Sequence, residues 1–232
     1  MRHARSIALA AALSAAGSAT AQSTNIDFNN QRGVPTAGYA AAGLPGVWNA
    51  LLGPEGVAES LVGLDGLSIT ATITQTGAAA IDGFDHPMMD GEVAALLEDR
   101  LLSFFPTINL DFEGLDNGLY QVFTYAFSRS PRDARVTIND DPATAFDYIT
   151  GWTGALELGV NYAMHIADVV DGSLRISIDF PGDDPVVQGV QLVLVPGPGA
   201  AALLLVGGYF SAVGKRRRRI TTCRAPGTLS GC

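Results

Sequence analysis

Apolar and polar residues alternate along most of the chain between residues 25 and 195. A strand with one face on a core and the other in water has this period of two. Clusters of Gly, Asp and Asn interrupt the alternation about every ten residues, as turns do. The pattern predicts an all-β chain folded as an antiparallel β-sandwich. The expected strands cover residues 25–28, 68–75, 107–115, 120–128, 134–140, 155–160, 162–170, 173–180 and 186–195.

A helical pattern interrupts these strands between residues 90 and 104. Val93, Leu96, Leu97 and Leu101 fall on one face, which predicts one short helix. Asp90 stands just before this pattern, where an aspartate caps the first turn of a helix.

Two further segments have distinct local signals. Segment 31–56 is rich in Gly and Pro and predicts an irregular loop that wraps the sandwich. Trp48 lies within it, and we expect so large an aromatic side chain to be buried in the core. Asn139, Asp140 and Asp141 have the composition of a hairpin turn.

The N-terminus has the three parts of a secretory signal peptide. A basic start precedes an apolar stretch at residues 7–16, and the small residues Ala19 and Ala21 follow it. This order predicts a signal peptide over residues 1–21 with cleavage before Gln22. A buried Ala-rich helix is the alternative interpretation.

The segment between the two ends is strongly acidic. It holds all 23 acidic residues and only six arginines, so its net charge is −17. Such a field repels phosphate backbones, which argues against nucleic-acid binding. The segment is long enough for one sizeable core. Cys223 and Cys232 are the only cysteines and both lie near the C-terminus, so neither a disulfide in the domain nor a structural zinc site is expected.

A membrane segment is predicted after the sandwich. The apolar run at residues 199–214 would form a helix of roughly 24 Å, short of the ~30 Å hydrocarbon core. Five cations follow and predict a cytoplasmic end by the positive-inside rule, which leaves the sandwich outside and residues 220–232 as a cytoplasmic tail. These stop-transfer cations are Lys215, Arg216, Arg217, Arg218 and Arg219.

The sequence VPGPG, the apolar run and KRRRR together resemble a PEP-CTERM sorting signal over residues 195–219. The resemblance implies processing by an exosortase near Val195, Pro196, Gly197 and Pro198, after export by the export machinery and signal peptidase. Gly197 stands where the family has its namesake glutamate, and the chain continues past the cations. Residues 22–194, from NIDF to VVQGVQLVLV, are similar to galactose-binding-like jelly-roll domains.

Candidate chemistry in the sandwich is sparse. Asp82, Asp85, His86 and Asp90 lie close in sequence and could hold a hard cation, with a solvated acidic loop as the alternative. His165 alternates with Tyr162 and Met164 and is expected to be a sandwich residue. Neighbouring carboxylates, as in Glu98–Asp99 and Asp183–Asp184, are expected to point apart. No Ser–His–Asp motif or phosphate-binding loop occurs, so we predict no catalytic set and no cofactor.

Some side chains could instead bind a ligand. Tyr39, Tyr148 and Trp152 could stack on sugar rings if exposed, and would otherwise fill the core. Arg129, Arg132 and Arg135 form a basic cluster that is either a solvated turn or a contact for an anionic polymer.

These observations predict an exported, non-enzymatic protein of the cell surface or extracellular matrix. It would be membrane-anchored, transiently or permanently, with its domain outside the cytoplasmic membrane. The first alternative is a surface carbohydrate-binding module that binds extracellular polysaccharide. The second is a surface hydrolase, which would require carboxylates or His86 to converge in one pocket.

The predicted sorting signal at residues 195–219 can be tested by mutation. Replacing Arg216, Arg217, Arg218 and Arg219 with serine should leave export intact, because the signal peptide is unchanged, but should impair membrane retention and processing. Mass spectrometry of the mature protein in cells that possess an exosortase measures the outcome. Wild-type chains that persist in the membrane and still end at Cys232 would show a permanent anchor instead.

Overall fold

The computed structural model describes residues 22–28, 31–51 and 55–196. The predicted cleavage residues Ala19 and Ala21, the membrane segment 199–214, the cations and the tail 220–232 lie outside these residues, as do Gly197 and Pro198. Val195 and Pro196 are described and exposed. Among the described residues, no helix has the length and apolar character needed to cross a membrane.

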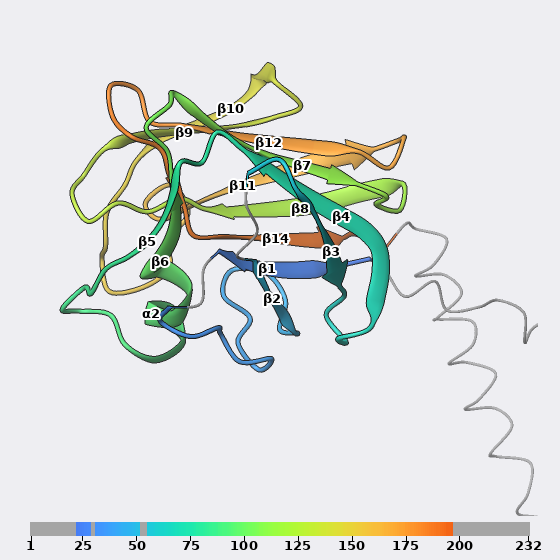
Figure 1. The fold of residues 1–232 in the computed structure, drawn as a ribbon, viewed down its shortest axis with the longest axis horizontal. Helices are drawn as coiled ribbons and strands as arrows, with labels where there is room; N and C mark the ends of the chain where they lie inside the picture. Colours follow the sequence, from blue (N-terminus) through green and yellow to red (C-terminus); the bar gives the residue numbers. More distant parts are fainter. Residues whose placement is uncertain (1–21, 29–30, 52–54, 197–232) are drawn as a thin grey trace, which may run out of the picture. The chain divides into compact units, whose positions relative to one another are not determined.

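Two large sheets face each other (Figure 1). The five-stranded sheet has the order β11-β8-β14-β1-β2, and the six-stranded sheet has the order β10-β9-β12-β7-β4-β3. A small third sheet, β13-β6-β5, lies beside them. The predicted all-β sandwich with one short helix is therefore observed.

The strands are numbered in their order along the chain. The first eight strands are β1 (Thr24–Phe28), β2 (Trp48–Leu51), β3 (Ala58–Val62), β4 (Ser68–Thr76), β5 (Ala80–Gly83), β6 (Asp99–Leu102), β7 (Thr107–Glu113) and β8 (Gly118–Tyr125). The others are β9 (Asp133–Ile138), β10 (Asp141–Ile149), β11 (Tyr162–Val169), β12 (Leu174–Asp179), β13 (Val186–Val187) and β14 (Gly189–Leu194). The helix α2 covers Gly91–Leu97.

Alternating apolar side chains of the strands fill the space between the two large sheets. In β7 every second residue is inaccessible to solvent, namely Ile108, Leu110 and Phe112. β12 contributes Ile176 and Ile178 in register with them. At roughly 25 cal/mol per Å² of buried apolar surface, this layer is the main favourable term in folding.

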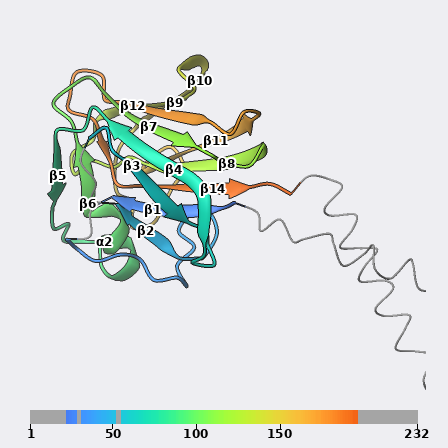
Figure 2. The same cartoon turned by 45° about the vertical axis from the view of Figure 1, so that its right-hand side comes forward.

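A second apolar layer covers the outer face of the five-stranded sheet. Tyr125, Phe127 and Val193 pack there against Trp48 and against Leu96 of α2. β2 is the edge strand of this sheet, beside β1, and Figure 2 shows α2 close to β1, β2 and β6. β1 and β14 are therefore buried on both faces, which the alternating pattern did not predict.

The side chain of Gln191 joins the wrapping loop to that outer face. Its amide nitrogen donates to Asn25 Oδ1 at 2.8 Å and to the carbonyl oxygens of Ala40 and Leu44. Its amide oxygen accepts from Tyr125 Oη at 2.5 Å and from the Gly43 N–H at 2.9 Å. A Cβ at position 43 would lie 2.9 Å from this oxygen, so a side chain there would displace the Gln191 amide.

The prediction of one continuous helical pattern over residues 90–104 is wrong. The helix ends at Leu97, and Asp99–Leu102 form β6, which pairs with β5 and β13. Tertiary pairing overrides local propensity here. Asp90 occupies the N-cap position, but its side chain makes no capping hydrogen bond.

Other predicted strands also change. Residues 155–160 form an irregular connection that ends in a turn, where the Asn161 side chain accepts from the Glu157 N–H and donates to the Ala155 carbonyl. The strand expected at 186–195 is interrupted at Gln188, whose side chain bonds the backbone of Phe127. The prediction was an antiparallel sandwich, but β1 and β2 run parallel to each other. The sequence analysis missed β2, β3, β5 and β10.

Two local predictions are confirmed. Asn139 and Asp140 both have left-handed backbone angles and form the turn between β9 and β10. Trp48 is buried, with 5% of its surface exposed, although it lies in β2 rather than in a loop. Its ring stacks on Tyr39 with centroids 6.3 Å apart.

Replacing Gln191 with leucine should lower the free energy of unfolding by about 3–5 kcal/mol, because several buried polar groups lose their partner. Urea denaturation measures this change. Gln121→Leu is the matched control. Gln121 lies in the neighbouring strand β8, on the same face of the sheet as Gln191, and is only partly buried. Equal losses for the two variants would contradict a special role for the Gln191 amide.

Candidate functional site

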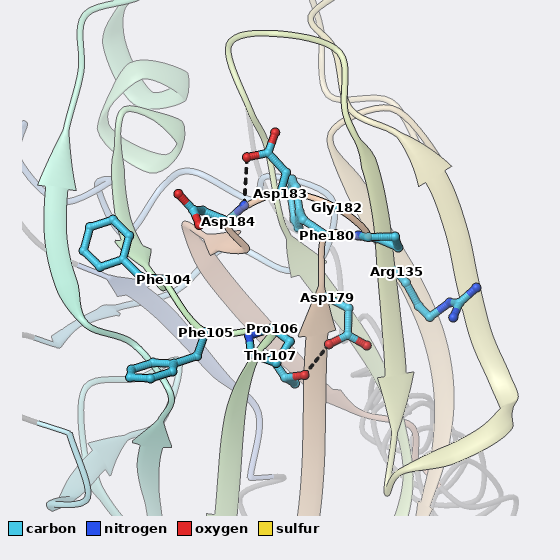
Figure 3. Close-up of a pocket in the computed structure, with 11 residues that line it drawn as sticks. Phe104, Phe105, Pro106, Thr107, Arg135, Asp179, Phe180, Gly182, Asp183 and Asp184 are labelled. Carbon is cyan, nitrogen blue, oxygen red and sulfur yellow. Dashed lines mark hydrogen bonds between the residues drawn. The ribbon is translucent and has the colours of Figure 1, made fainter.

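An open groove of about 640 Å³ lies at one end of the six-stranded sheet (Figure 3). Three segments form it: the connection between β6 and β7, the connection between β12 and β13, and Arg135 of β9. Its lining residues are Phe104, Phe105, Pro106, Thr107, Arg135, Asp179, Phe180, Pro181, Gly182, Asp183 and Asp184.

Two adjacent aromatic side chains form one side of the groove. Phe104 is 67% exposed and Phe105 is 59% exposed. Buried Ser103 holds their connection, because its hydroxyl oxygen accepts from the Phe105 N–H at 2.8 Å and its N–H donates to the Pro185 carbonyl at 3.0 Å. The two phenyl rings therefore form an exposed apolar patch on an anchored loop.

Polar side chains line the opposite side, and the strand register puts them in one row. Asp179 of β12 pairs with Thr107 of β7 and with Arg135 of β9. The Thr107 hydroxyl donates to Asp179 Oδ1 at 2.5 Å. In Figure 3 the two phenyl rings and Arg135 lie on opposite sides of Asp179.

Asp147 of β10 extends this row. Arg135 donates to both of its carboxylate oxygens, at 2.6 and 3.3 Å. These bonds lower the pKa of Asp147 and raise the pKa of Arg135, so both stay charged across the ordinary range. Both side chains are largely exposed, so the pair orients Arg135 more than it stabilises the fold.

A tight turn closes the end of the groove. Gly182 has a left-handed φ of 81°, and the Asp183 N–H donates to the Phe180 carbonyl at 2.9 Å. Asp183 also forms an ion pair with Arg132. A second groove, of about 400 Å³, adjoins the first, because Arg135 and Pro181 line both.

The three arginines predicted as a basic cluster all have partners. Arg132 pairs with Asp183 and Arg135 with Asp147, while the Arg129 guanidinium lies 5.6 Å from the centre of the Phe84 ring. The charges of Arg132 and Arg135 are therefore offset by aspartates.

Of the three aromatic residues predicted as ligand contacts, Tyr148 lines the second groove, whereas Tyr39 and Trp152 line neither groove. Tyr148 is 7% exposed and its hydroxyl donates to the Ala126 carbonyl at 2.8 Å. Tyr39 and Trp152 are half-buried and pack against the second apolar layer. Burial, and then the charge of Glu92, raises the pKa of Tyr39 to about 12.

The structure separates the acidic residues predicted as a cation site. Asp82 pairs with Arg100 and Asp85 with Arg32, each at 2.7 Å, while His86 contacts the Phe127 ring. Asp90 is exposed at the start of α2. Within the described ranges, no group of three or more His, Cys, Asp or Glu side chains is arranged to hold a metal ion.

His165 is buried in β11, as the alternation predicts, and its Nε2 lies 3.0 Å from the Thr144 carbonyl oxygen. Burial lowers its pKa, so the imidazole is neutral at pH 7. It lines none of the grooves described above.

The sequence analysis missed Phe104 and Phe105. The signal was present in the sequence SFFP, because a proline after two adjacent aromatics prevents a regular buried element. The predicted helical pattern ended at Phe104, and Phe105 belonged to no predicted element.

No protein-family model and no curated protein matches the chain. Among solved structures, β-glucuronidase 2 from Bacteroides uniformis resembles it at 8% identity and a TM-score of 0.46, over 76% of this chain and 18% of the enzyme. A family 35 carbohydrate-binding module from Clostridium thermocellum resembles it at 13% identity and a TM-score of 0.33, over 53% of this chain and 92% of the module. A family 35 module from Cellvibrio japonicus Abf62 resembles it at 14% identity and a TM-score of 0.29, over 50% of this chain and 87% of the module.

Proposed function

We propose that this chain is an exported, non-enzymatic protein that binds extracellular polysaccharide in the groove beside Phe104 and Phe105. The observation that carries the proposal is the pair of exposed phenyl rings on an anchored loop, facing a row of hydrogen-bonding side chains. Sugar rings have apolar faces that stack on aromatic rings, and edges of hydroxyl groups that bond carboxylates and guanidinium groups.

The charges in the groove favour an uncharged glycan. Arg132 and Arg135 are both paired with aspartates, while Asp179 and Asp184 add negative charge. A polysaccharide rich in carboxylates or sulfates would meet net repulsion there. The two adjoining grooves provide room for several sugar units of one chain.

Signal peptide and sorting tag complete the proposal. Export would bring the sandwich outside the cytoplasmic membrane, and the PEP-CTERM-like segment would hold it there, transiently or permanently. An exosortase would then act near Pro196, which is exposed at the end of the described sandwich. Glycan binding would fix the released domain in the extracellular matrix.

A surface hydrolase is the second candidate, because Asp179, Asp183 and Asp184 line one groove. Asp179 accepts the Thr107 hydroxyl and Asp183 is paired with Arg132, so two of the three carboxylates already have partners. Release of reducing sugar ends from any glycan that binds would favour the hydrolase.

A glycan array tests the proposal with the purified chain. Phe104→Ala with Phe105→Ala should weaken binding by roughly tenfold or more, which corresponds to about 1.4 kcal/mol of lost stacking. The melting temperature should stay close to that of the wild type, because both rings are exposed. Leu67→Ala is the matched control, since Leu67 is 65% exposed on a turn elsewhere. Undiminished binding by the double variant would contradict this site.

A further inference from the structure

The second groove, of about 400 Å³, continues the first one across β9 and β10. Arg135 and Pro181 line both grooves. The other residues that line the second groove are Asp133, Ala134, Asp147, Tyr148 and Ile149. A glycan bound beside Phe104 and Phe105 therefore has a second set of side chains within reach on the far side of Arg135.

A straight row of polar side chains connects the two grooves, because β7, β12, β9 and β10 are successive neighbours in the six-stranded sheet. Thr107 of β7 pairs with Asp179 of β12, and Asp179 pairs with Arg135 of β9. Arg135 in turn pairs with Asp147 of β10. In Figure 3 Thr107, Asp179 and Arg135 follow one another across neighbouring strands. Adjacent strands lie about 4.8 Å apart, so the row is roughly 14 Å long.

An exposed apolar side chain lies at the β10 end of this row. Ile149 is 62% exposed and is the next residue after Asp147 on the outer face of β10. It pairs across the strands with Asp133 of β9. Tyr148 also lines this groove, but it is only 7% exposed and its hydroxyl donates to the Ala126 carbonyl. Ile149 is therefore the apolar surface that the second groove offers to a ligand.

Asp133 adds a hydrogen-bond acceptor beside Ile149. Asp147 already accepts two hydrogen bonds from Arg135, whereas the exposed Asp133 carboxylate forms no hydrogen bond or ion pair with the described residues. Residues paired across two strands have Cβ atoms about 5 Å apart. The pair of Asp133 and Ile149 thus presents a free acceptor for hydroxyl groups next to a surface for the apolar face of a sugar ring.

We propose that the second groove is a further sugar subsite, and that the two grooves together bind an extended, uncharged, β-1,4-linked glycan laid across the strands. This inference rests on the proposed glycan site beside Phe104 and Phe105. A β-1,4-linked chain of glucose, mannose or xylose is extended, so it can follow a straight row over four strands. An α-1,4-linked glucan coils and would leave the row after its first units. The free charge of Asp133 disfavours chains that carry carboxylates or sulfates.

The dependence of binding on chain length tests this inference. Isothermal titration calorimetry of the purified full chain compares β-1,4-linked gluco-, manno- and xylo-oligosaccharides of two and of six units, with maltohexaose as the coiled α-1,4-linked chain. In at least one β-linked series the hexasaccharide should bind roughly tenfold or more tightly than the disaccharide, because only the longer chain reaches Ile149. Maltohexaose should bind at least about tenfold more weakly than that hexasaccharide.

Two substitutions locate the gain from the longer chain. Ile149→Ala should weaken hexasaccharide binding about fivefold, and Asp133→Ala about threefold. Both should leave disaccharide binding within about twofold of the wild type, because the disaccharide occupies the groove beside Phe104. Ile166→Ala is the matched control, since Ile166 is 57% exposed on β11 and lines neither groove. The melting temperatures of all three variants should stay close to that of the wild type, because the replaced side chains are exposed.

Several results would overturn the inference and are distinguishable from failure of the glycan site itself. Equal affinities for disaccharide and hexasaccharide, or a length gain that survives both Ile149→Ala and Asp133→Ala, would remove the second subsite and leave the site beside Phe104 in place. Maltohexaose that binds as tightly as the β-linked hexasaccharides would rule out the extended chain. If none of these oligosaccharides binds, the inference is wrong, whereas the proposed function fails only if the glycan array finds no ligand that depends on Phe104 and Phe105.

Discussion

The amide of Gln191 is the interaction on which the layered structure depends. It reaches from β14 to β1, to the Tyr125 hydroxyl and to three backbone groups of the wrapping loop. A loop rich in Gly and Pro has no ladder of its own, so its polar groups need partners when it covers an apolar face. One buried amide, which both donates and accepts, supplies them. β1 and β14 are thereby buried on both faces of the five-stranded sheet.

This asymmetry between the two sheets decides where polar and aromatic side chains stay accessible to solvent. The loop and α2 close the outer face of the five-stranded sheet over β1, β14 and part of β8, and Tyr39 and Trp152 pack against the apolar layer there. The six-stranded sheet has no such cover. Its register aligns Thr107, Asp179 and Arg135 at one end, where the Phe104–Phe105 connection projects outward. The groove is thus a consequence of leaving one sheet open.

The same covering layer creates an electrostatic problem at Asp27. A polar residue on the outer face of β1 would ordinarily be solvated, but the second layer removes it from water. Burial next to another carboxylate is unfavourable for the charged form, and hydrogen bonds from the described residues do not offset it.

Local chemistry in the sequence determined the strand-rich class, the turn at Asn139 and Asp140, the burial of Trp48, and most strands of the two large sheets. Those features depend on residues a few positions apart, which a pattern of period two records. The burial of β1 and β14 on both faces, the conversion of Asp99–Leu102 into a strand, and the meeting of Phe104 with Asp179 depend on segments distant in the chain. Only the tertiary structure decided these, because pairing partners and solvent access are properties of the assembled layers and not of any local segment.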